Sequence, residues 1–422
     1  KNDIMQNSKG SGGVQMRILH TGDWHLGKNL EGHSRLQEQE EFLKDFVKMV
    51  EEQNIDLVII AGDVYDTSNP PAAAEKLFYD TLKKLSKNGE RITLVIAGNH
   101  DNPERLVAAG PLAMEHGIVM VGTPKTVVQT GAYGQHEVVN SGEGYIELKI
   151  RDERAVILAV PYPSEKRLNE VLYHEMEEAE ERAATYGERI KELFASLSTH
   201  YRKDTINLVT SHLFAMDSEE GGSERSIQLG GSYIVSGDCF PEEAQYIALG
   251  HVHKPQIVPG TNKRARYSGS PLHYNKKEIS YEKKCFVVDV KPNEEAKVEE
   301  IPIKVYKPIE IWKCESIEAA LERCEKEKDK DCYVYLEIET ERYIREDEIK
   351  EMKSLKVDIL EILPKIKGQE MVEDEIERLT EQSFEDIFKA FYKKERGTDV
   401  EPEILEVLLN LLGEEETEDE TH

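Results

Sequence analysis

Side chains that bind metals or move protons recur in short groups at wide intervals along the chain. Each group follows a run of apolar residues that ends in a small turn: RILHTG, DLVIIAG, ITLVIAG, INLVTS and YIALG. Carboxylate, amide and imidazole groups are ligands that divalent cations take in proteins. The residues concerned are Asp23, His25, Asp63, Asn99, His100, Asp101, His212, His251 and His253.

The placement of these groups predicts one shared site. Apolar runs of this kind are typical of buried strands, and the carboxyl ends of neighbouring strands in an α/β sheet open onto one crevice. Taken singly, Asp63 fits a turn and His212 fits a buried core histidine. Five such coincidences at strand ends favour a site instead. Trp24, between Asp23 and His25, is interpreted as packing or as a spacer, with stacking on a nucleic-acid base as the alternative.

The ligand types indicate the metal and its chemistry. Oxygen and imidazole ligands without a thiolate favour an octahedral ion such as Mn²⁺ or Fe²⁺ over a closed zinc site. The ligands outnumber those that one ion uses, which predicts two ions. Two ions about 3.5 to 4 Å apart stabilise the attacking and leaving oxygens of a displacement at phosphorus. Asp63 is the candidate bridging ligand, and His100 would protonate the leaving oxygen, with Asp101 either orienting its ring or raising its pKa.

Apolar and helical segments alternate as far as residue 290, which predicts an α/β or layered β-sandwich core. A helix is expected over residues 34–53. A second is expected to begin with Asn69 as its cap and to close at Gly89. Residues 165–200 indicate a long, charged helical insertion.

Beyond about residue 300, strands and helices alternate in a smaller α/β unit that is followed by two helical stretches. The predicted domains are a tag or linker at 1–15, a metal-bearing domain at 16–300, a small α/β domain at 301–368, and helices with an acidic tail at 369–422. An apolar helix near the chain end either packs on its own domain or docks on a partner. The candidate docking residues are Phe384, Ile387, Phe388, Phe391, Leu405, Leu408 and Leu412.

Composition limits the function. Five cysteines without a C-x-x-C pair, and no apolar run near the roughly 20 residues that span a bilayer, predict a cytoplasmic globular protein. The net charge of −29 has the wrong sign for extended contact with phosphates. DNA binding would need metal ions, a basic partner or a local basic patch, and no base-reading element is evident. The candidate patch residues, which also fit a scattered exposed set, are Lys28, Arg35, Arg264, Arg266, Lys276 and Lys277.

The motifs D-x-H, GD, GNHD, H and GHxH, in this order, resemble those of the calcineurin-like metallophosphoesterases. The stretches MRILHTGDWHLGK, AGDVYD, AGNHD, ALGHVHKPQ and RYSGSPL are similar to those of the nucleases of double-strand break repair. This resemblance covers residues 16 to about 290 and continues more loosely beyond them. It implies a layered β-sandwich core flanked by helices, a small α/β capping domain and C-terminal helices.

The resemblance also implies roles for individual residues. One Mn²⁺ ion would be held by Asp23, His25, Asp63 and His253. The other would be held by Asp63, Asn99, His212 and His251, with His100 as the catalytic histidine. Archaeal and eukaryotic relatives have a second functional histidine where this chain has Asp66, so that role is not transferred.

The implied activity is that of a Mn²⁺-dependent DNA exonuclease and endonuclease acting at DNA ends in repair, recombination and replication. The implied assembly is a homodimer with a coiled-coil ABC-type ATPase docked on the C-terminal helices. This chain lacks a G-x-x-x-x-G-K-[ST] loop of its own, so any ATP dependence must come from that partner. The alternatives are another phosphodiesterase or phosphatase and a metal-bearing scaffold. The phosphatase motifs GDxxDRG and GNHE are replaced here by GDVYDTS and GNHD, which favours the nuclease.

Overall fold

The computed structural model describes residues 15–168, 179–221 and 234–366. The chain divides into two compact units between Pro308 and Ile309. The candidate docking residues between Phe384 and Leu412, and residues 1–14 of the expected tag or linker, lie outside the described residues.

The first unit is built on two sheets that face each other. The first sheet contains four parallel strands, β1, β4, β5 and β6, and is completed by an antiparallel pair on one side. Its strands, in spatial order, are β18 (Lys297–Pro302), β17 (Lys284–Val290), β1 (Met16–Thr21), β4 (Leu57–Ala61), β5 (Ile92–Ile96) and β6 (Ile118–Val121).

The second sheet combines a parallel centre with antiparallel strands on both sides. Its strands, in spatial order, are β15 (Gln256–Ile257), β16 (Ala265–Tyr267), β14 (Tyr246–Gly250), β11 (Ile206–His212), β10 (Glu153–Val160), β9 (Tyr145–Ile150), β8 (His136–Gly142) and β7 (Gly131–Tyr133). Shorter elements lie in the connections between strands of the same sheet: β2 (Asn29–Leu30), β3 (His33–Ser34), α3 (Pro103–Val107), α4 (Gly110–Met114), β12 (Phe214–Ala215) and β13 (Ile234–Val235).

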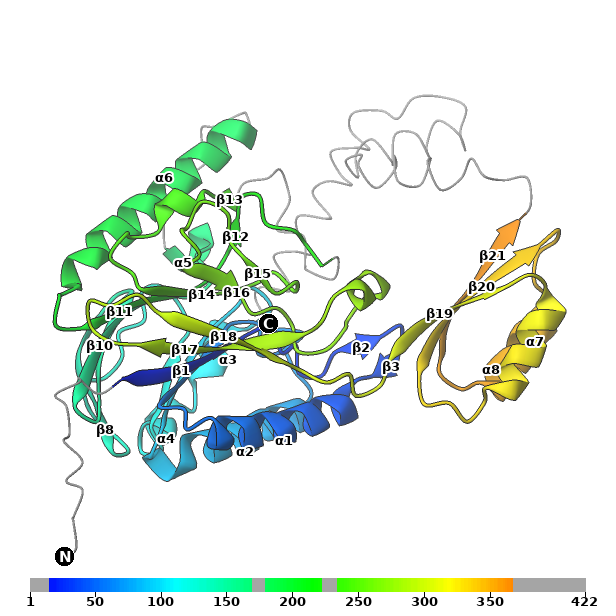
Figure 1. The fold of residues 1–422 in the computed structure, drawn as a ribbon, viewed down its shortest axis with the longest axis horizontal. Helices are drawn as coiled ribbons and strands as arrows, with labels where there is room; N and C mark the ends of the chain where they lie inside the picture. Colours follow the sequence, from blue (N-terminus) through cyan, green and yellow to red (C-terminus); the bar gives the residue numbers. More distant parts are fainter. Residues whose placement is uncertain (1–14, 169–178, 222–233, 367–422) are drawn as a thin grey trace, which may run out of the picture. The chain divides into compact units, whose positions relative to one another are not determined.

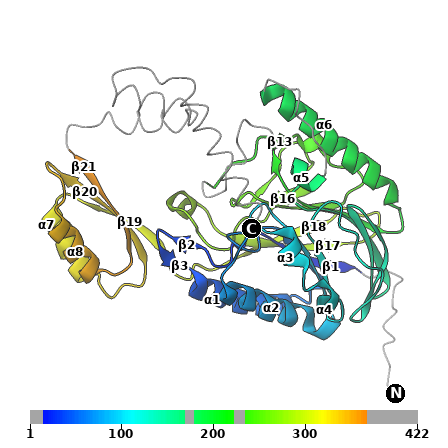
Figure 2. The same ribbon diagram turned by 180° about the vertical axis from the view of Figure 1, so that it is seen from behind.

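The layers explain why the strand sequences are apolar on both faces. One core lies between the sheets, and it unites β1, β4 and β5 with β10, β11 and β14. Helices α1 (Leu36–Glu52) and α2 (Ala72–Ser86) cover the outer face of the first sheet, and α6 (Ala179–Leu197) covers that of the second (Figure 1). Figure 2 shows these helices on opposite sides of the sheets from behind. A strand buried on both faces carries no polar alternation. The predicted layered α/β sandwich is confirmed.

A polar link joins the two sheets close to their loop-bearing ends. The His20 ring, in β1, is fully buried, and burial lowers its pKa to about 3, so the ring is neutral. Its Nε2 donates to the carbonyl of Leu249 in β14 at 3.1 Å, and its Nδ1 accepts from the Tyr246 hydroxyl at 2.9 Å. One side chain therefore fixes the first sheet against the second.

The expected start of the second helix is wrong. Pro71 is the N-cap of α2, and Asn69 instead accepts a hydrogen bond from Arg105 at 2.6 Å. The helix begins after the prolines because the residue before a proline is pushed to extended backbone. It ends at Ser86 and is followed by a 3₁₀ turn, η1 (Lys87–Gly89). The expected charged insertion contains α5 (Glu165–Leu168), α6 and the 3₁₀ turn η2 (Ser198–His200).

The second unit has its own core around a three-stranded parallel sheet. Its elements are β19 (Ile309–Cys314), α7 (Ile317–Lys326), β20 (Tyr333–Thr340), α8 (Glu346–Leu355) and β21 (Ile359–Ile366). The expected boundary after residue 300 falls inside β18, which is paired with β17, so we place the boundary at Pro308. Among the described residues, no helix has the length and apolar character needed to cross a membrane.

The packing of α1 generates a stability prediction. Phe46 is fully buried, with its ring centroid 5.8 Å from that of Trp24 and 5.5 Å from that of Phe42. Phe46→Ala should lower the free energy of unfolding by about 3 to 5 kcal/mol, because it leaves a cavity among rigid aromatic rings. Urea denaturation measures this loss. Lys48→Ala, on the exposed face of α1, is the control and should change stability by less than about 0.5 kcal/mol.

Candidate metal centre

The carboxyl ends of strands from both sheets deliver the predicted ligands to one place. In the first sheet, the parallel strands β1, β4 and β5 lead into the turns that carry Asp23, Asp63 and Asn99. In the second sheet, β11 ends at His212, and His251 directly follows β14, its parallel neighbour. The parallel pairing within each sheet sets these side chains at the same edge.

The backbone at these turns is strained. Asp23, His25, Asp63 and His251 have φ angles of 51°, 45°, 46° and 103°, in the left-handed region that non-glycine residues rarely occupy. Hydrogen bonds between the turns hold this geometry: the Asp23 amide donates to the Gly62 carbonyl, and the His25 amide donates to the Asp63 carbonyl, each at 3.0 Å. Such strain is maintained at sites where side chains must be aimed in fixed directions.

Two glycines allow the turns to approach each other. A Cβ atom on Gly98 would collide with the Asp63 carboxylate, and one on Gly250 would collide with the Ala61 carbonyl. These positions therefore exclude every other residue without backbone movement. The close approach brings loops of the two sheets into direct contact.

The Asp63 carboxylate lies at the centre of the cluster. Its Oδ1 accepts from the His100 amide at 2.9 Å, and its Oδ2 faces three imidazole nitrogens. The distances are 3.4 Å to His212 Nε2, 3.6 Å to His25 Nε2 and 4.0 Å to His100 Nε2. Burial opposes ionisation, but the imidazoles of His212 and His100 hold the pKa of Asp63 well below its usual range. This central position is the one a bridging ligand requires.

Three groups of side chains have the spacing of metal ligands. The first combines Asp23, His25 and His253, and the second combines Asp63, His212 and His251. The third, of His25, Asp63 and His100, shares one residue with each of the others. The side-chain oxygen of Asn99 joins the second group, at 2.9 Å from His212 Nε2 and 3.2 Å from His251 Nδ1. The structure thus brings all seven predicted ligands together, and the groups are able to hold divalent metal ions.

The protonation pattern fits bound cations. His25 Nε2 and His253 Nε2 face each other at 2.9 Å. Their other ring nitrogens lie beside carboxylates, 3.5 Å from Asp66 for His25 and 3.3 Å from Glu278 for His253. A carboxylate only accepts, so with a proton on each Nδ1 the two Nε2 lone pairs are available to ligate one cation. Metal-binding histidines ordinarily have such partners at the other nitrogen.

Burial also makes charge costly at this site. It raises the pKa of Asp23 to about 7, and it lowers the pKa of His25 to about 3. Asp23 Oδ2 is buried without a hydrogen-bond partner among the described residues. A buried carboxylate oxygen without a donor is unfavourable unless a cation compensates it, so the donor set suits a metal.

The expectation that Asp101 orients the His100 ring is wrong. The His100 ring donates from Nδ1 to the backbone carbonyl of Asp66 at 2.7 Å, which leaves Nε2 facing Asp63. The Asp101 carboxylate is buried and accepts three backbone amides within 3.1 Å, so it ties the two loops together. The amides belong to Gly98, Val64 and Tyr65.

Asp66 contacts two of the site's histidines. Its carbonyl orients His100, and its carboxylate lies 3.5 Å from His25 Nδ1 while accepting from Lys28 Nζ at 2.7 Å. Burial opposes ionisation, but His25 and Lys28 lower the pKa of Asp66 to about 2. The residue whose role the sequence left open therefore positions both rings.

Trp24 is a packing residue, as expected. Its side chain is fully buried, and its indole Nε1 donates to Thr21 Oγ1 at 3.0 Å. The ring centroid lies within 6.3 Å of those of three phenylalanines from α1 and α2, in edge-to-face contacts. These are Phe42, Phe46 and Phe78. The indole anchors the turn that carries the first two ligands.

A buried ion pair behind His253 was not foreseen. Glu278 and Lys283 are 0% and 2% exposed, and their charged groups are 2.6 Å apart. Lys283 Nζ also donates to the His253 carbonyl at 3.1 Å and to Ser270 Oγ at 2.7 Å. In the sequence, Glu278 lies within the basic run NKKEIS, which is typical of solvated surface, and no signal there distinguishes it.

The candidate DNA-contacting residues fall into different places. Lys276 and Lys277 are exposed and belong to η4 (Lys276–Ser280), the 3₁₀ turn that also carries Glu278. Lys28 is at the site, paired with Asp66. Arg35 is only 1% exposed, and its guanidinium donates to Glu38 and to the His273 carbonyl, so it presents no charge to solvent.

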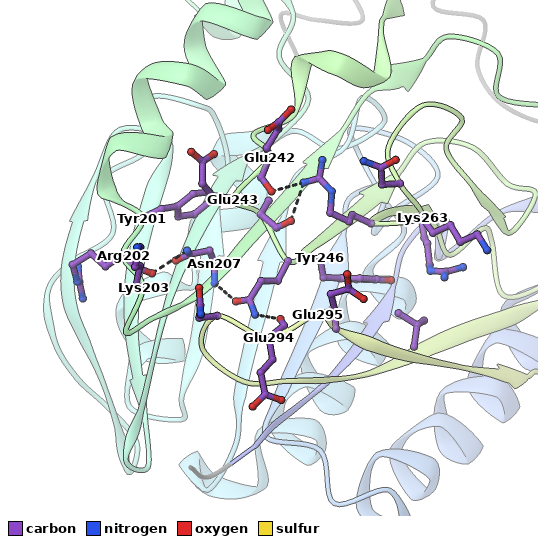
Figure 3. Close-up of a pocket in the computed structure, with 18 residues that line it drawn as sticks. Tyr201, Arg202, Lys203, Asn207, Glu242, Glu243, Tyr246, Lys263, Glu294 and Glu295 are labelled. Atoms are coloured by element: carbon purple, nitrogen blue, oxygen red, sulfur yellow. Dashed lines mark hydrogen bonds between the residues drawn. The ribbon is translucent and has the colours of Figure 1, made fainter. Parts of the chain in front are cut away.

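Arg264 and Arg266 lie at the opposite ends of the strands from the ligands. They line a polar cavity of about 950 Å³ with Tyr246, the first residue of β14, whereas His251 follows the last (Figure 3). Arg264 donates to three backbone carbonyls there, and the Arg266 guanidinium lies 5.5 Å from the Phe286 ring centroid. Acidic residues line the same cavity, among them Glu242, Glu243, Glu294 and Glu295.

Comparison with known proteins places this geometry in a family. The calcineurin-like phosphoesterase model matches residues 16–255, and the model of the type 5 capsule protein repressor C-terminal domain matches residues 305–396. The SbcD subunit of the nuclease SbcCD from Bacillus subtilis (strain 168) is 39% identical over 406 residues, covering 96% of this chain and 100% of the relative.

Two further relatives carry the same name. The SbcD subunit of Rhodobacter capsulatus is 32% identical over 287 residues, covering 65% of this chain and 66% of the relative. That of Escherichia coli (strain K12) is 28% identical over 388 residues, covering 88% of this chain and 92% of the relative. The chain is thus a calcineurin-like phosphoesterase and belongs to the SbcD family of nuclease subunits.

Proposed function

We infer that this chain is a metal-dependent DNA nuclease that hydrolyses phosphodiester bonds. The observation that carries the inference is the buried Asp63 carboxylate, which faces imidazoles of the first two ligand groups while His100 stands beside it. The names of the relatives supply the substrate class, because each is called a nuclease. Phosphatase activity on the same fold is the alternative that the assays below distinguish.

The proposed assignment of ligands starts from the first two of these groups and shares Asp63 between the two ions. One divalent ion would be held by Asp23, His25, Asp63 and His253, and the other by Asp63, Asn99, His212 and His251. Two such ions would activate a water molecule and neutralise charge on the scissile phosphate. We propose Mn²⁺, because oxygen and imidazole ligands without thiolate suit it.

The side chain of His100 supplies the proton in this mechanism. Its ring is 12% exposed and is held by the bond from Nδ1 to the Asp66 carbonyl. Nε2 therefore points towards Asp63, where the phosphate would bind, and the ring, protonated on both nitrogens, would donate its Nε2 proton to the leaving oxygen. Asp101 stays within the protein and keeps the loop of His100 against the loop of Asp63.

We propose that DNA is held through its backbone at the rim that includes Lys276, Lys277 and Lys28. The first two are exposed beside Glu278, which contacts the ligand His253. Lysines at a rim neutralise phosphates without reading sequence, which suits an enzyme that acts on DNA ends. The cavity at Arg264 and Arg266 is not part of this path.

The name of the relatives describes a subunit of a complex, which supports a protein partner for this chain. We propose that this chain forms a homodimer and acts with a coiled-coil ABC-type ATPase in double-strand break processing. The candidate docking residues for that partner, from Phe384 to Leu412, lie outside the described residues.

Removal of the central carboxylate should abolish tight metal binding. Asp63→Asn removes one negative charge from a ligand that both ions would share. The affinity for Mn²⁺ should therefore fall by more than about 100-fold, which is more than the loss caused by replacing a residue that only hydrogen-bonds to a ligand. Calorimetric titration of chelator-treated protein with MnCl₂ measures the loss. Asp80→Asn, on the exposed face of α2, is the control and should bind as the unaltered chain does. Equal binding by both variants would contradict the assignment.

His100→Ala should separate catalysis from metal binding. We expect nucleotide release from linear duplex DNA with Mn²⁺ to fall by about 10²- to 10⁴-fold, because the leaving oxygen loses its proton donor, while two ions still bind. Release assays and the titration above give both readouts. Absence of release by the unaltered chain with any divalent metal, even with the partner ATPase and ATP, would overturn the nuclease assignment. Hydrolysis of p-nitrophenyl phosphate under those conditions would establish the phosphatase.

Replacement of both rim lysines should weaken DNA binding. The double variant Lys276→Ala, Lys277→Ala removes two contacts to phosphates. The slope of the logarithm of the DNA-binding constant against the logarithm of the salt concentration should therefore become shallower by about two. Fluorescence anisotropy with labelled duplex at several salt concentrations measures the slope. The matched control is Lys203→Ala with Lys263→Ala, two exposed lysines of the far cavity (Figure 3). A larger effect of the control pair would place the DNA at the opposite end of the strands.

A further inference from the structure

The loop from Gly98 to Asp101 carries two side chains that must be aimed with precision. Asn99 faces His212 and His251, and His100 faces Asp63. The amide side of this loop is held by carboxylates: His100 N donates to Asp63, and Gly98 N donates to Asp101. These hydrogen bonds hold only the N–H groups of the loop, which could still rotate about them. The carbonyl groups of the loop therefore also need hydrogen-bond partners.

The carbonyl side of the loop is held by one arginine. Arg167 Nη1 donates to the Gly98 carbonyl, and Nη2 donates to the Asp101 carbonyl, each at 2.7 Å. These carbonyls directly flank Asn99 and His100. Arg167 belongs to α5, part of the charged insertion, and comes from outside both sheets.

Arg167 is itself fixed in place. Its guanidinium carbon lies 5.3 Å from the ring centroid of Tyr162, whose amide donates to the Ala97 carbonyl at 3.1 Å. The backbone amide of Arg167 meets Ser164 Oγ at 3.4 Å. A planar guanidinium stacked on an aromatic ring keeps its fork of donors in one orientation. The segment that connects β10 to the charged insertion is thereby bonded to the chain at and just before this loop, through the Tyr162 amide and through the Arg167 guanidinium.

We propose that Arg167 is a positioning residue that sets the direction of both Asn99 and His100 by bridging the carbonyls on either side of them. It acts through the backbone and touches neither metal nor substrate. A lysine in its place presents a single ammonium group and reaches one carbonyl where the guanidinium reaches two. The consequence for activity depends on the proposed nuclease function, whereas the consequence for metal binding does not.

The test compares Arg167→Ala and Arg167→Lys in the full chain with Arg189→Ala, which removes a half-exposed arginine of α6 in the same insertion. Mn²⁺ affinity is measured by calorimetry, and the spin coupling of a bound ion pair is measured by electron paramagnetic resonance. Arg167→Ala should weaken Mn²⁺ binding by about 10- to 100-fold, the range for groups that orient a ligand. Arg167→Lys should lie between Arg167→Ala and the unaltered chain, and Arg189→Ala should match the unaltered chain.

Activity supplies the second readout. Arg167→Ala at saturating Mn²⁺ should lower kcat of DNA cleavage by about 10-fold or more, because misaimed His100 delivers its proton poorly. The affinity for DNA, measured by anisotropy in Ca²⁺, should stay within twofold. Weakened DNA affinity with unchanged metal binding would overturn the proposal and make Arg167 a substrate contact. Unchanged metal binding and kcat would overturn it as well and leave only a structural role.

Folding and the proposed function are checked separately. The circular dichroism and urea midpoint of each variant show whether it is folded, and Arg167→Lys retains the charge and stem if Arg167→Ala unfolds. If the unaltered chain cleaves no DNA, the nuclease assignment fails, but the calorimetric and resonance comparisons still decide the role of Arg167.

Discussion

A negatively charged oxygen buried among imidazoles is the interaction on which the rest of this structure depends. Asp63 Oδ2 faces His25, His212 and His100 from a position that is 1% exposed. Such a charge is costly unless partners surround it, and each partner comes from a different part of the chain. The β1 turn, the β5 loop and the end of β11 must therefore meet at one point, which the two facing sheets make possible.

The surrounding structure serves to keep that meeting point rigid. The His20 ring fixes β1 against β14 just below the ligand-bearing turns. Asp101 joins the loops after β4 and β5, and Trp24 anchors the first turn to the helices. Each contact replaces flexibility at a functional turn with a hydrogen bond or packed ring, so the ligands are held before any cation binds. The strained φ angles at Asp23 and Asp63 persist because so many contacts over-determine them.

The sequence predicted the parts of this site that follow from position along a strand. Asp63 and His212 were identifiable because apolar runs precede them, and a strand buried on both faces leaves a clear pattern. The strands of residues 131–150 escaped notice because their exposed and buried residues alternate weakly, as the pattern of β8 shows. Glu278 was missed and Asp101 was given the wrong partner, because their true partners are backbone amides or side chains far away in sequence. Arg35 was wrongly considered a DNA-contacting residue, because the sequence shows that a side chain is charged but not whether it is buried.

The dispersal of the ligands has a consequence for synthesis of the chain. Asp23 and His253 lie 230 residues apart in sequence, and β1 completes its pairing only with β17, whose last residue is Val290. A ribosome adds about 5 to 20 residues each second, so the first ligand emerges roughly 10 to 50 seconds before the last. During that interval the nascent protein has no hydrolytic centre. Topology alone thus delays assembly of the hydrolytic centre until nearly all of the first unit has been synthesised.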